Sequence, residues 1–169
     1  NNIIHRDLKP ANILMDEFLC PKVGDFGLSK GIDNTVNSTT EIKGTPPYMS
    51  PEIWTEVKYS TKSDVYAFGI IVYEIIMVKR PFENCSLLEI QKKVINGNRP
   101  IMDKSIPNSY RELIERCWSQ EPTKRPSFKE IVELLRKNEK FLEELTDKED
   151  FLDYLDYIDN CKKDINHNK

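Results

Sequence analysis

The sequence predicts a mainly α-helical domain that opens with a small β-hairpin. Three features predict this fold class. Helix-start signals recur through the second half of the chain, a long segment at 61–78 is apolar on nearly every side, and two short strand-like runs precede it. A helix without a polar face belongs at the centre of a domain, with other helices packed on it.

The first predicted elements are two strands, at residues 13–15 and 20–23, joined by a turn at Asp16-Glu17. After them, residues 31–45 form a polar stretch without periodicity. Structureless stretches of this length are uncommon inside compact domains and are usually functional. We therefore predict a functional loop between the hairpin and the helical part of the chain.

The helical part begins with the apolar helix from Thr61 to Val78. Four Ser/Thr-x-x-Glu capping boxes mark further helix starts, at Ser86–Glu89, Ser109–Glu112, Ser127–Glu130 and Thr146–Glu149. In such a box the hydroxyl accepts a hydrogen bond from the N3 amide, while the glutamate reaches back to the N-cap amide. Asn96-Gly97 is the stop signal of the helix that starts at Ser86.

Composition excludes several classes of protein. Of the 169 residues, 38% are hydrophobic and 31% are charged, which is enough apolar material for a buried core. The longest nearly apolar run, 67–78, contains Glu74, whereas a membrane span needs about 20 apolar residues. The net charge of −3 supplies no basic field for nucleic acid. We therefore expect neither a membrane nor a nucleic acid as a partner.

The four cysteines are scattered along the chain, at positions 20, 85, 117 and 161. They form no CxxC pair, and only two histidines accompany them. This pattern argues against a zinc site and against a disulfide framework. Free thiols are the ordinary state in a reducing compartment, so the expected location is cytoplasmic.

Negative charge is concentrated at the C-terminal end. Residues 138–169 carry ten acids and five bases, a net charge of −5, whereas residues 1–137 have a net charge of +2. Phe151, Leu155 and Ile158 would share one face of a helix here. We predict an acidic helical tail at 138–169, which either packs on the domain or is solvated, or else docks to a partner.

The N-terminal part contains the groups that phosphoryl transfer requires, within residues 5–12 (His-Arg-Asp-Leu-Lys-Pro-Ala-Asn) and 25–27 (Asp-Phe-Gly). A carboxylate must orient the attacking hydroxyl, a cation must neutralise charge on the transferred group, and oxygen ligands must hold magnesium. Asp7 can supply the first and Lys9 the second. Asn12 and Asp25 can supply the third, because a short hairpin brings Asp25 back beside the loop.

These motifs resemble those of the eukaryotic protein kinase family, and they occur in the family's order. The matching segments are 5–12, 25–27, 44–52 (Gly-Thr-Pro-Pro-Tyr-Met-Ser-Pro-Glu), 64–69 (Asp-Val-Tyr-Ala-Phe-Gly) and 125–126 (Arg-Pro). The resemblance covers residues 1–137. It implies the C-terminal lobe of a protein kinase domain, mainly α with a small β-hairpin, that uses ATP and Mg²⁺ as cofactors.

The resemblance implies a role for each matching residue at the nucleotide site. Asp7 would be the catalytic base, and Lys9 would contact the transferred phosphate. Asn12 and Asp25 would be the metal ligands, and with Lys9 they would bind the nucleotide. Leu14, two residues after the asparagine, would form the floor under adenine.

The resemblance also implies structural roles. His5 and Phe26 would pack together as part of the spine that links the two lobes of a kinase. Asp64 would accept hydrogen bonds from backbone amides of the catalytic loop, although a simple N-cap is the alternative for this residue taken alone. Glu52 and Arg125 would form the buried ion pair that anchors the activation segment.

Two positions imply specificity for serine and threonine in protein substrates. Lys9 follows the catalytic aspartate as in serine/threonine kinases, and in that group the threonine that corresponds to Thr45 bonds the catalytic Asp and Lys. Residues 117–118 (Cys-Trp) and 125–128 resemble the tyrosine-kinase-like branch of the family. Tyr66 departs from the pattern, since the family usually has Trp there. A tyrosine-kinase-like enzyme in signalling, with Ser/Thr specificity, is the resulting expectation.

Regulation is expected to involve Arg6, which precedes the catalytic aspartate and can pair with an activating phosphate on the loop. Glu41 lies three residues before Gly44, where many kinases carry that phosphothreonine. We hypothesise that Glu41 partly substitutes for a phosphate and that Thr39 or Thr40 adds a regulated increment. The alternative is a hydrophilic loop without a switch.

No segment of the 169 residues matches the glycine-rich loop, the strand lysine or the helix glutamate of the family's N-terminal lobe. Without these parts the positioning of ATP fails even with Asp7 intact. We therefore predict that this chain alone is inactive and that a longer parent, which supplies the missing N-terminal lobe, is the kinase. The alternative is a non-catalytic kinase remnant that binds partners, and the coding sequence upstream of Asn1 would distinguish the two.

Overall fold

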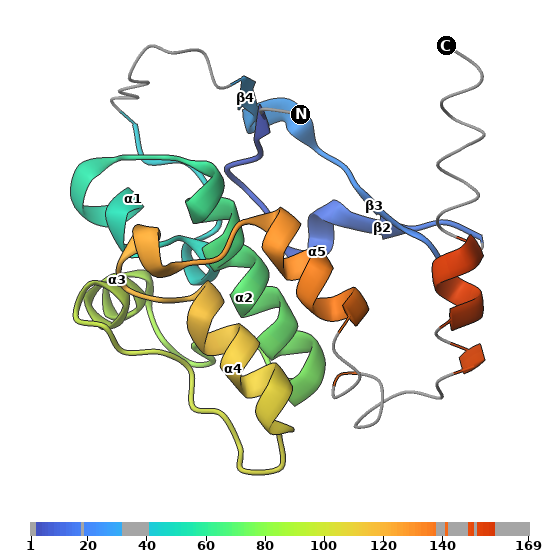
Figure 1. The fold of residues 1–169 in the computed structure, drawn as a ribbon. Helices are drawn as coiled ribbons and strands as arrows, with labels where there is room; N and C mark the ends of the chain where they lie inside the picture. The colour runs from blue at the N-terminus through green and yellow to red at the C-terminus, as the bar shows by residue number, and fades with distance from the viewer. Residues whose placement is uncertain are drawn as a thin grey trace.

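The computed structural model describes residues 3–17, 19–31 and 41–137, and in the tail 141, 149–150 and 152–157. Figure 1 shows the long helix α2 (Thr61–Met77) running through the middle of the fold, with α4 (Asn108–Cys117) and α5 (Phe128–Lys137) on one side of it. The strands lie at one edge of the fold, where β1 (Ile3–Ile4) contacts the start of α2. The mainly α fold with a small β part is confirmed.

In the described part of the chain, two antiparallel two-stranded sheets carry the β structure. They pair β1 (Ile3–Ile4) with β4 (Lys30–Gly31) and β2 (Ile13–Met15) with β3 (Pro21–Val23). The β2–β3 hairpin is the predicted one, with its second strand one residue shorter at the start. Asp16 closes its turn, because the Asp16 carboxylate accepts a hydrogen bond from the Cys20 N–H at 2.8 Å. The β1–β4 pair was not predicted.

Helix α2 is buried along most of its length, where its side chains are mainly apolar, whereas Ile75 near its end is 67% exposed. Ser60 caps it: its hydroxyl accepts from the Lys62 N–H at 3.2 Å, and the Ser63 hydroxyl accepts from the Ser60 N–H at 3.1 Å. The helix ends at Met77, one residue before the predicted end, since Val78 adopts a left-handed conformation with φ 51°. The N-terminus of α2 lies beside the first residues of the chain, because Asp64 in its first turn accepts a hydrogen bond from the His5 N–H.

The other α-helices are α1 (Pro51–Glu56), α3 (Leu87–Ile95), α4 and α5, and short 3₁₀ helices lie at Pro10–Asn12, Phe26–Leu28, Pro46–Tyr48 and Pro122–Lys124. The capping boxes at Ser86 and Ser127 are confirmed. The box at Ser109 is wrong: α4 begins at Asn108 after Pro107, which leaves the Ser109 side chain buried in the first turn. Thr146 lies outside the described residues.

The core is built on α2. Tyr66, Ile70 and Ile114 are fully buried in its largest cluster. A second cluster contains Phe141, whose ring meets that of Tyr110 edge-on at 4.9 Å. Phe141, which belongs to the predicted tail 138–169, is therefore part of the core.

The described end of the tail lies beside the β2–β3 hairpin (Figure 1). Residues 152–157 are helical, and burial together with the neighbouring Cys20 and Asp16 raises the pKa of Tyr154. Phe151 and Ile158 lie outside the described residues. This short helix therefore contacts the hairpin through Tyr154.

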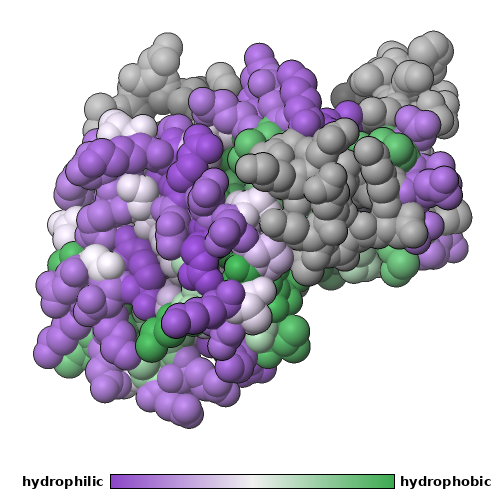
Figure 2. Space-filling view, turned by 60° about the horizontal axis from the view of Figure 1, so that its bottom comes forward, coloured by the Kyte–Doolittle hydropathy of each residue, from purple (hydrophilic) through white to green (hydrophobic). Residues whose placement is uncertain are grey.

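The face of the molecule drawn in Figure 2 is mostly hydrophilic. Figure 2 shows hydrophilic side chains over most of the described face, with hydrophobic ones in small separate groups. Among the described residues, no helix combines the length and apolar character needed to cross a bilayer.

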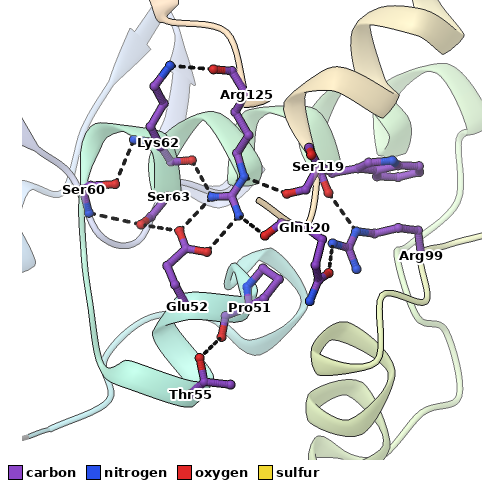
Figure 3. A network of polar contacts seen from close by, with 11 residues as sticks. Pro51, Glu52, Thr55, Ser60, Lys62, Ser63, Arg99, Ser119, Gln120 and Arg125 are labelled. Atoms are coloured by element: carbon purple, nitrogen blue, oxygen red, sulfur yellow. Dashed lines mark hydrogen bonds and ion pairs between the residues drawn. The ribbon is translucent and has the colours of Figure 1, made fainter. Parts of the chain in front are cut away.

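A buried ion pair joins α1 to the segment before α5 (Figure 3). Both guanidinium Nη atoms of Arg125 donate to the Glu52 carboxylate, at 2.7 and 2.8 Å, and Ser63 donates to the same carboxylate at 3.0 Å. Arg125 also donates to the carbonyl oxygens of Ser119 and Lys62, each at 2.9 Å. Burial disfavours the charged form, but the hydrogen bonds and charge of Arg125 hold the pKa of Glu52 below its ordinary value.

Candidate active site

Asp7 lies at the centre of a hydrogen-bonded cluster. The Lys9 Nζ atom is 2.7 Å from Asp7 Oδ2, and the Thr45 hydroxyl donates to Asp7 Oδ1 at 2.6 Å. Lys9 also donates to the Thr45 hydroxyl at 2.9 Å, which closes a triangle. Burial alone would raise the pKa of Asp7, but hydrogen bonds from Lys9, Thr45 and Asn12 hold it below its ordinary value. Asp7 is therefore an oriented carboxylate at neutral pH.

Asp64 fixes the backbone that carries Asp7. Its two carboxylate oxygens accept hydrogen bonds from the N–H groups of His5 and Arg6, at 2.8 and 3.1 Å. Arg6 adopts a left-handed conformation with φ 71°, which is unusual for a residue with a side chain. Burial raises the pKa of Asp64, although the two N–H groups favour its ionised form. The start of α2 thus holds a strained turn immediately before Asp7.

The β2–β3 hairpin brings Asp25 back to the same region. The Gly24 N–H donates to the Asn12 carbonyl at 2.8 Å, so Asp25 follows directly after the pairing with Asn12. His5 lies beside the same point, with Nε2 2.9 Å from the Gly24 carbonyl oxygen. The rings of His5 and Phe26 are 5.2 Å apart between centroids. The contacts expected of these residues are present, while their roles stay predictions.

The oxygen donors of Asn12 and Asp25 fit a magnesium ion that is bound together with a nucleotide. Asn12 donates through its NH₂ group to the Asp7 backbone carbonyl at 2.8 Å, which leaves its Oδ1 atom as an acceptor. Asp25 is exposed, and its carboxylate accepts one long bond, of 3.4 Å, from the Gly27 N–H. Mg²⁺ is usually held by one or two carboxylates plus substrate phosphates. Accordingly, the described part of the chain contains no all-protein cluster of three metal-binding side chains.

Leu14, the expected floor under adenine, lies on β2 with 62% of its surface exposed. Its Cδ1 atom would be 3.6 Å from a side-chain carbon placed on Gly24, so Leu14 lies close to the residue that follows β3. An exposed leucine on a rigid hairpin is an apolar surface that a planar ring could cover. The structure leaves this role open to test.

Tyr59 joins Arg6 to the segment that carries Thr45, and the sequence reasoning missed it. Its hydroxyl accepts from the Lys43 N–H at 2.6 Å and donates to the Lys43 carbonyl at 2.7 Å. The Arg6 guanidinium lies over the Tyr59 ring, 5.1 Å from its centroid. Gly44 follows with φ 122°, and a side-chain carbon there would be 2.9 Å from the Arg6 carbonyl. No periodicity signals such a tyrosine, because its hydrogen bonds to Lys43 and its ring contact with Arg6 join it to distant segments.

Comparison with known proteins identifies the family. Residues 1–135 match the family model of protein tyrosine and serine/threonine kinases. The chain belongs to the protein kinase family. A probable LIM domain-containing serine/threonine-protein kinase of Dictyostelium discoideum is 45% identical over 135 residues, which cover 80% of this chain and 14% of that protein. The kinase fold therefore accounts for most of the described residues.

Two further relatives extend the comparison. Dual specificity protein kinase shkC of Dictyostelium discoideum is 41% identical over 136 residues, which cover 78% of this chain and 27% of that kinase. Serine/threonine-protein kinase STY46 of Arabidopsis thaliana is 42% identical over 137 residues, which cover 80% of this chain and 24% of that kinase. The chain thus spans between 14% and 27% of the length of these three kinases.

The structure does not pair Glu41 with Arg6. The Glu41 side chain is 75% exposed, and its Oε2 atom lies 3.4 Å from Lys43 Nζ. In the described part of the chain, the buried Nε and Nη2 atoms of Arg6 have no hydrogen-bond partner. Glu41 therefore makes no contact that would let it stand in for a phosphate at Arg6. Thr39 and Thr40 lie outside the described residues.

Gly44→Ala is expected to lower kcat of the parent kinase by about 10- to 100-fold. The new side-chain carbon cannot stay 2.9 Å from the Arg6 carbonyl, and φ 122° is unfavourable for alanine, so Thr45 must move away from Asp7. Steady-state kinetics measure the effect. Gly31→Ala is the matched control, because an added carbon there meets nothing within 4 Å. Equal activity of the two variants would contradict the prediction.

Proposed function

We propose that residues 1–137 supply the C-terminal lobe of a serine/threonine protein kinase, which transfers the γ-phosphate of ATP to serine and threonine hydroxyls of proteins in signalling. The observation that carries this proposal is the closed triangle of Asp7, Lys9 and Thr45, with distances of 2.6 to 2.9 Å. The names of the relatives as serine/threonine-protein kinases support it.

In this proposal Asp7 orients the acceptor hydroxyl and takes its proton at a carboxylate oxygen as the hydroxyl oxygen bonds to the γ-phosphorus of ATP. The bond from that phosphorus to the bridging oxygen breaks in the same step, and ADP leaves. The lowered pKa of Asp7 keeps the carboxylate ionised and makes it a weak base. A weak base is adequate, because the transition state of phosphoryl transfer is loose. Lys9 places a cation where charge on the transferred group must be stabilised, and Thr45 holds both side chains in place.

Asn12 and Asp25 would hold magnesium, and Leu14 would contact the adenine ring. When bound, Mg²⁺ would neutralise negative charge on the phosphate oxygens of the nucleotide. The bond from Asn12 to the Asp7 carbonyl couples the metal ligand to the base, so the two groups are positioned by one loop. The hydrogen bond from the Gly24 N–H to the Asn12 carbonyl ties the hairpin that carries Asp25 to the same loop.

The function is tested with peptides that differ only in the acceptor residue. The parent protein, in which an N-terminal lobe precedes these residues, is expected to phosphorylate serine and threonine peptides and to discriminate against tyrosine. The purified 169-residue chain is expected to transfer no phosphate, since ATP would lack the contacts that position it. Asp7-dependent transfer by the chain alone contradicts the second expectation. An inactive parent supports the alternative, a binding module.

Regulation through Arg6 is part of the proposal. The unpartnered Nε and Nη2 atoms of a buried guanidinium are a receptor for a phosphate, because a charge-assisted bond would satisfy them. Thr39→Ala or Thr40→Ala is expected to reduce activity of the phosphorylated parent kinase. Glu41→Ala is expected to have less effect, since Glu41 pairs with Lys43. Phosphosite mapping and kinetics check this, and unchanged activity in all three variants would exclude the switch.

A further inference from the structure

A cavity lies at the far end of α2 from the catalytic loop. Its volume is about 590 Å³, and it forms where the end of α2, the segment after it, α3 and residues 97–101 meet. Asp64 lies in the first turn of α2 and Met77 is its last residue. By helical rise the two ends are about 20 Å apart. A ligand in this cavity is therefore remote from Asp7.

Positive charge predominates in the lining of the cavity. Four of its lining residues are basic, namely Lys79, Arg80, Lys93 and Arg99, and Glu83 is the one acid among them. None of the four cations forms an ion pair with a described carboxylate. The cavity thus has a net charge of +3, although the whole chain has −3.

Arg99 is the most firmly held of these cations. Its Nε atom donates to the Trp118 carbonyl at 3.0 Å, and Nη2 donates to Gln120 Oε1 at 2.7 Å. Its guanidinium also lies 5.1 Å from the centroid of the Tyr66 ring. All these partners are neutral, so Arg99 keeps its positive field while its position is fixed. A fixed cation loses little conformational entropy when an anion binds.

The rest of the cavity is apolar at its wall and rim. Tyr73 and Phe82 are buried aromatic residues in its lining. Ile101 lines it too, with 88% of its surface exposed. Aromatic walls with converging cations suit a peptide that carries both negative and apolar side chains.

We propose that this cavity is a docking site for an acidic peptide segment of a partner protein, which is bound through carboxylate or phosphorylated side chains. The size of the cavity favours a peptide over a small inorganic anion. The chain's own described tail residues 152–157 do not occupy it, because they lie beside the β2–β3 hairpin, on the opposite side of the fold from α3 (Figure 1). A docked partner would remain near Asp7 at a high effective concentration.

The test measures binding of fluorescent peptides to the 169-residue chain by anisotropy, without ATP, so its result is independent of the proposed kinase activity. The probes are a short peptide with clustered glutamates, its phosphoserine counterpart, and a counterpart with glutamine in place of glutamate. The acidic peptides are expected to bind at least about tenfold more tightly than the glutamine peptide. Their affinity should fall as ionic strength rises.

The variants localise the binding. Lys79→Glu together with Arg80→Glu reverses two exposed charges at the cavity and is expected to weaken binding at least about tenfold. Lys129→Glu together with Lys137→Glu changes the net charge equally on α5 and is the matched control. Equal affinities of the two double variants would overturn the proposal, because binding would then follow total charge alone.

Cys85 provides a second readout, because it lines the cavity with its Sγ atom 3.0 Å from Lys93 Nζ. Bound acidic peptide should slow alkylation of Cys85 several-fold, as followed by mass spectrometry. Unchanged alkylation at saturating peptide would place the binding elsewhere. Equally tight binding of single-stranded RNA would also overturn the proposal, since the surface would then select any polyanion.

Discussion

Replacing Arg125 with methionine is expected to lower the free energy of unfolding of the 169-residue chain by about 3–5 kcal/mol. Arg125 is 1% exposed and makes two short bonds to the Glu52 carboxylate. Its removal leaves a buried negative charge without its counter-ion and strands the carbonyl oxygens of Ser119 and Lys62. Domains of this kind are stable by about 5–15 kcal/mol, so the loss brings the chain close to unfolding.

Denaturant titration followed by fluorescence of the two tryptophans measures the effect. Lys124→Met is the matched control, because its ion pair with Glu121 is exposed and should contribute less than about 1 kcal/mol. A double variant, Glu52→Leu with Arg125→Met, should recover part of the loss, since it removes the stranded charge as well. A single Arg125 variant as stable as the Lys124 control would contradict the argument.

Where the structural signal is local, the sequence was enough to predict the element. The β2–β3 hairpin and the capping box at Ser86 depend on residues within a few positions of one another, and both are present. Helix α1 and the β1–β4 pair were missed because neither is stable by itself. Helix α1 has six residues, and its buried Glu52 is held by a bond from Arg125, 73 residues away.

The same distinction applies to the site. The motifs predict roles for Asp7, Asn12 and Asp25, because each lies at a fixed position within a short recognisable segment. They could not locate Tyr59, whose hydroxyl reaches the Lys43 backbone across 16 residues. The hypothesis that Glu41 substitutes for a phosphate gained no supporting contact with Arg6, for a related reason. Spacing along the chain identifies a position but not the direction of its side chain, and Glu41 points to Lys43.

Asp7→Asn in the parent kinase is expected to reduce kcat by about 10²- to 10⁴-fold. Asparagine keeps the shape of the side chain and can still accept a bond from Thr45, but it is neutral and cannot take a proton from the acceptor hydroxyl. It also removes the negative partner that lies 2.7 Å from Lys9 Nζ. Steady-state kinetics with a saturating peptide measure the loss.

The size of this effect separates a chemical role for Asp7 from a structural one. KM for ATP should change much less than kcat, because the proposed nucleotide contacts belong to Lys9, Asn12, Leu14 and Asp25, and all four residues are kept. The unfolding midpoint should also stay near that of the unmodified chain, since Asp7 is held mainly by side chains that can turn to solvent. Asp156→Asn, an exposed change of the same kind, is the control. An Asp7→Asn enzyme that retains more than about a tenth of its activity would rule out proton transfer to Asp7.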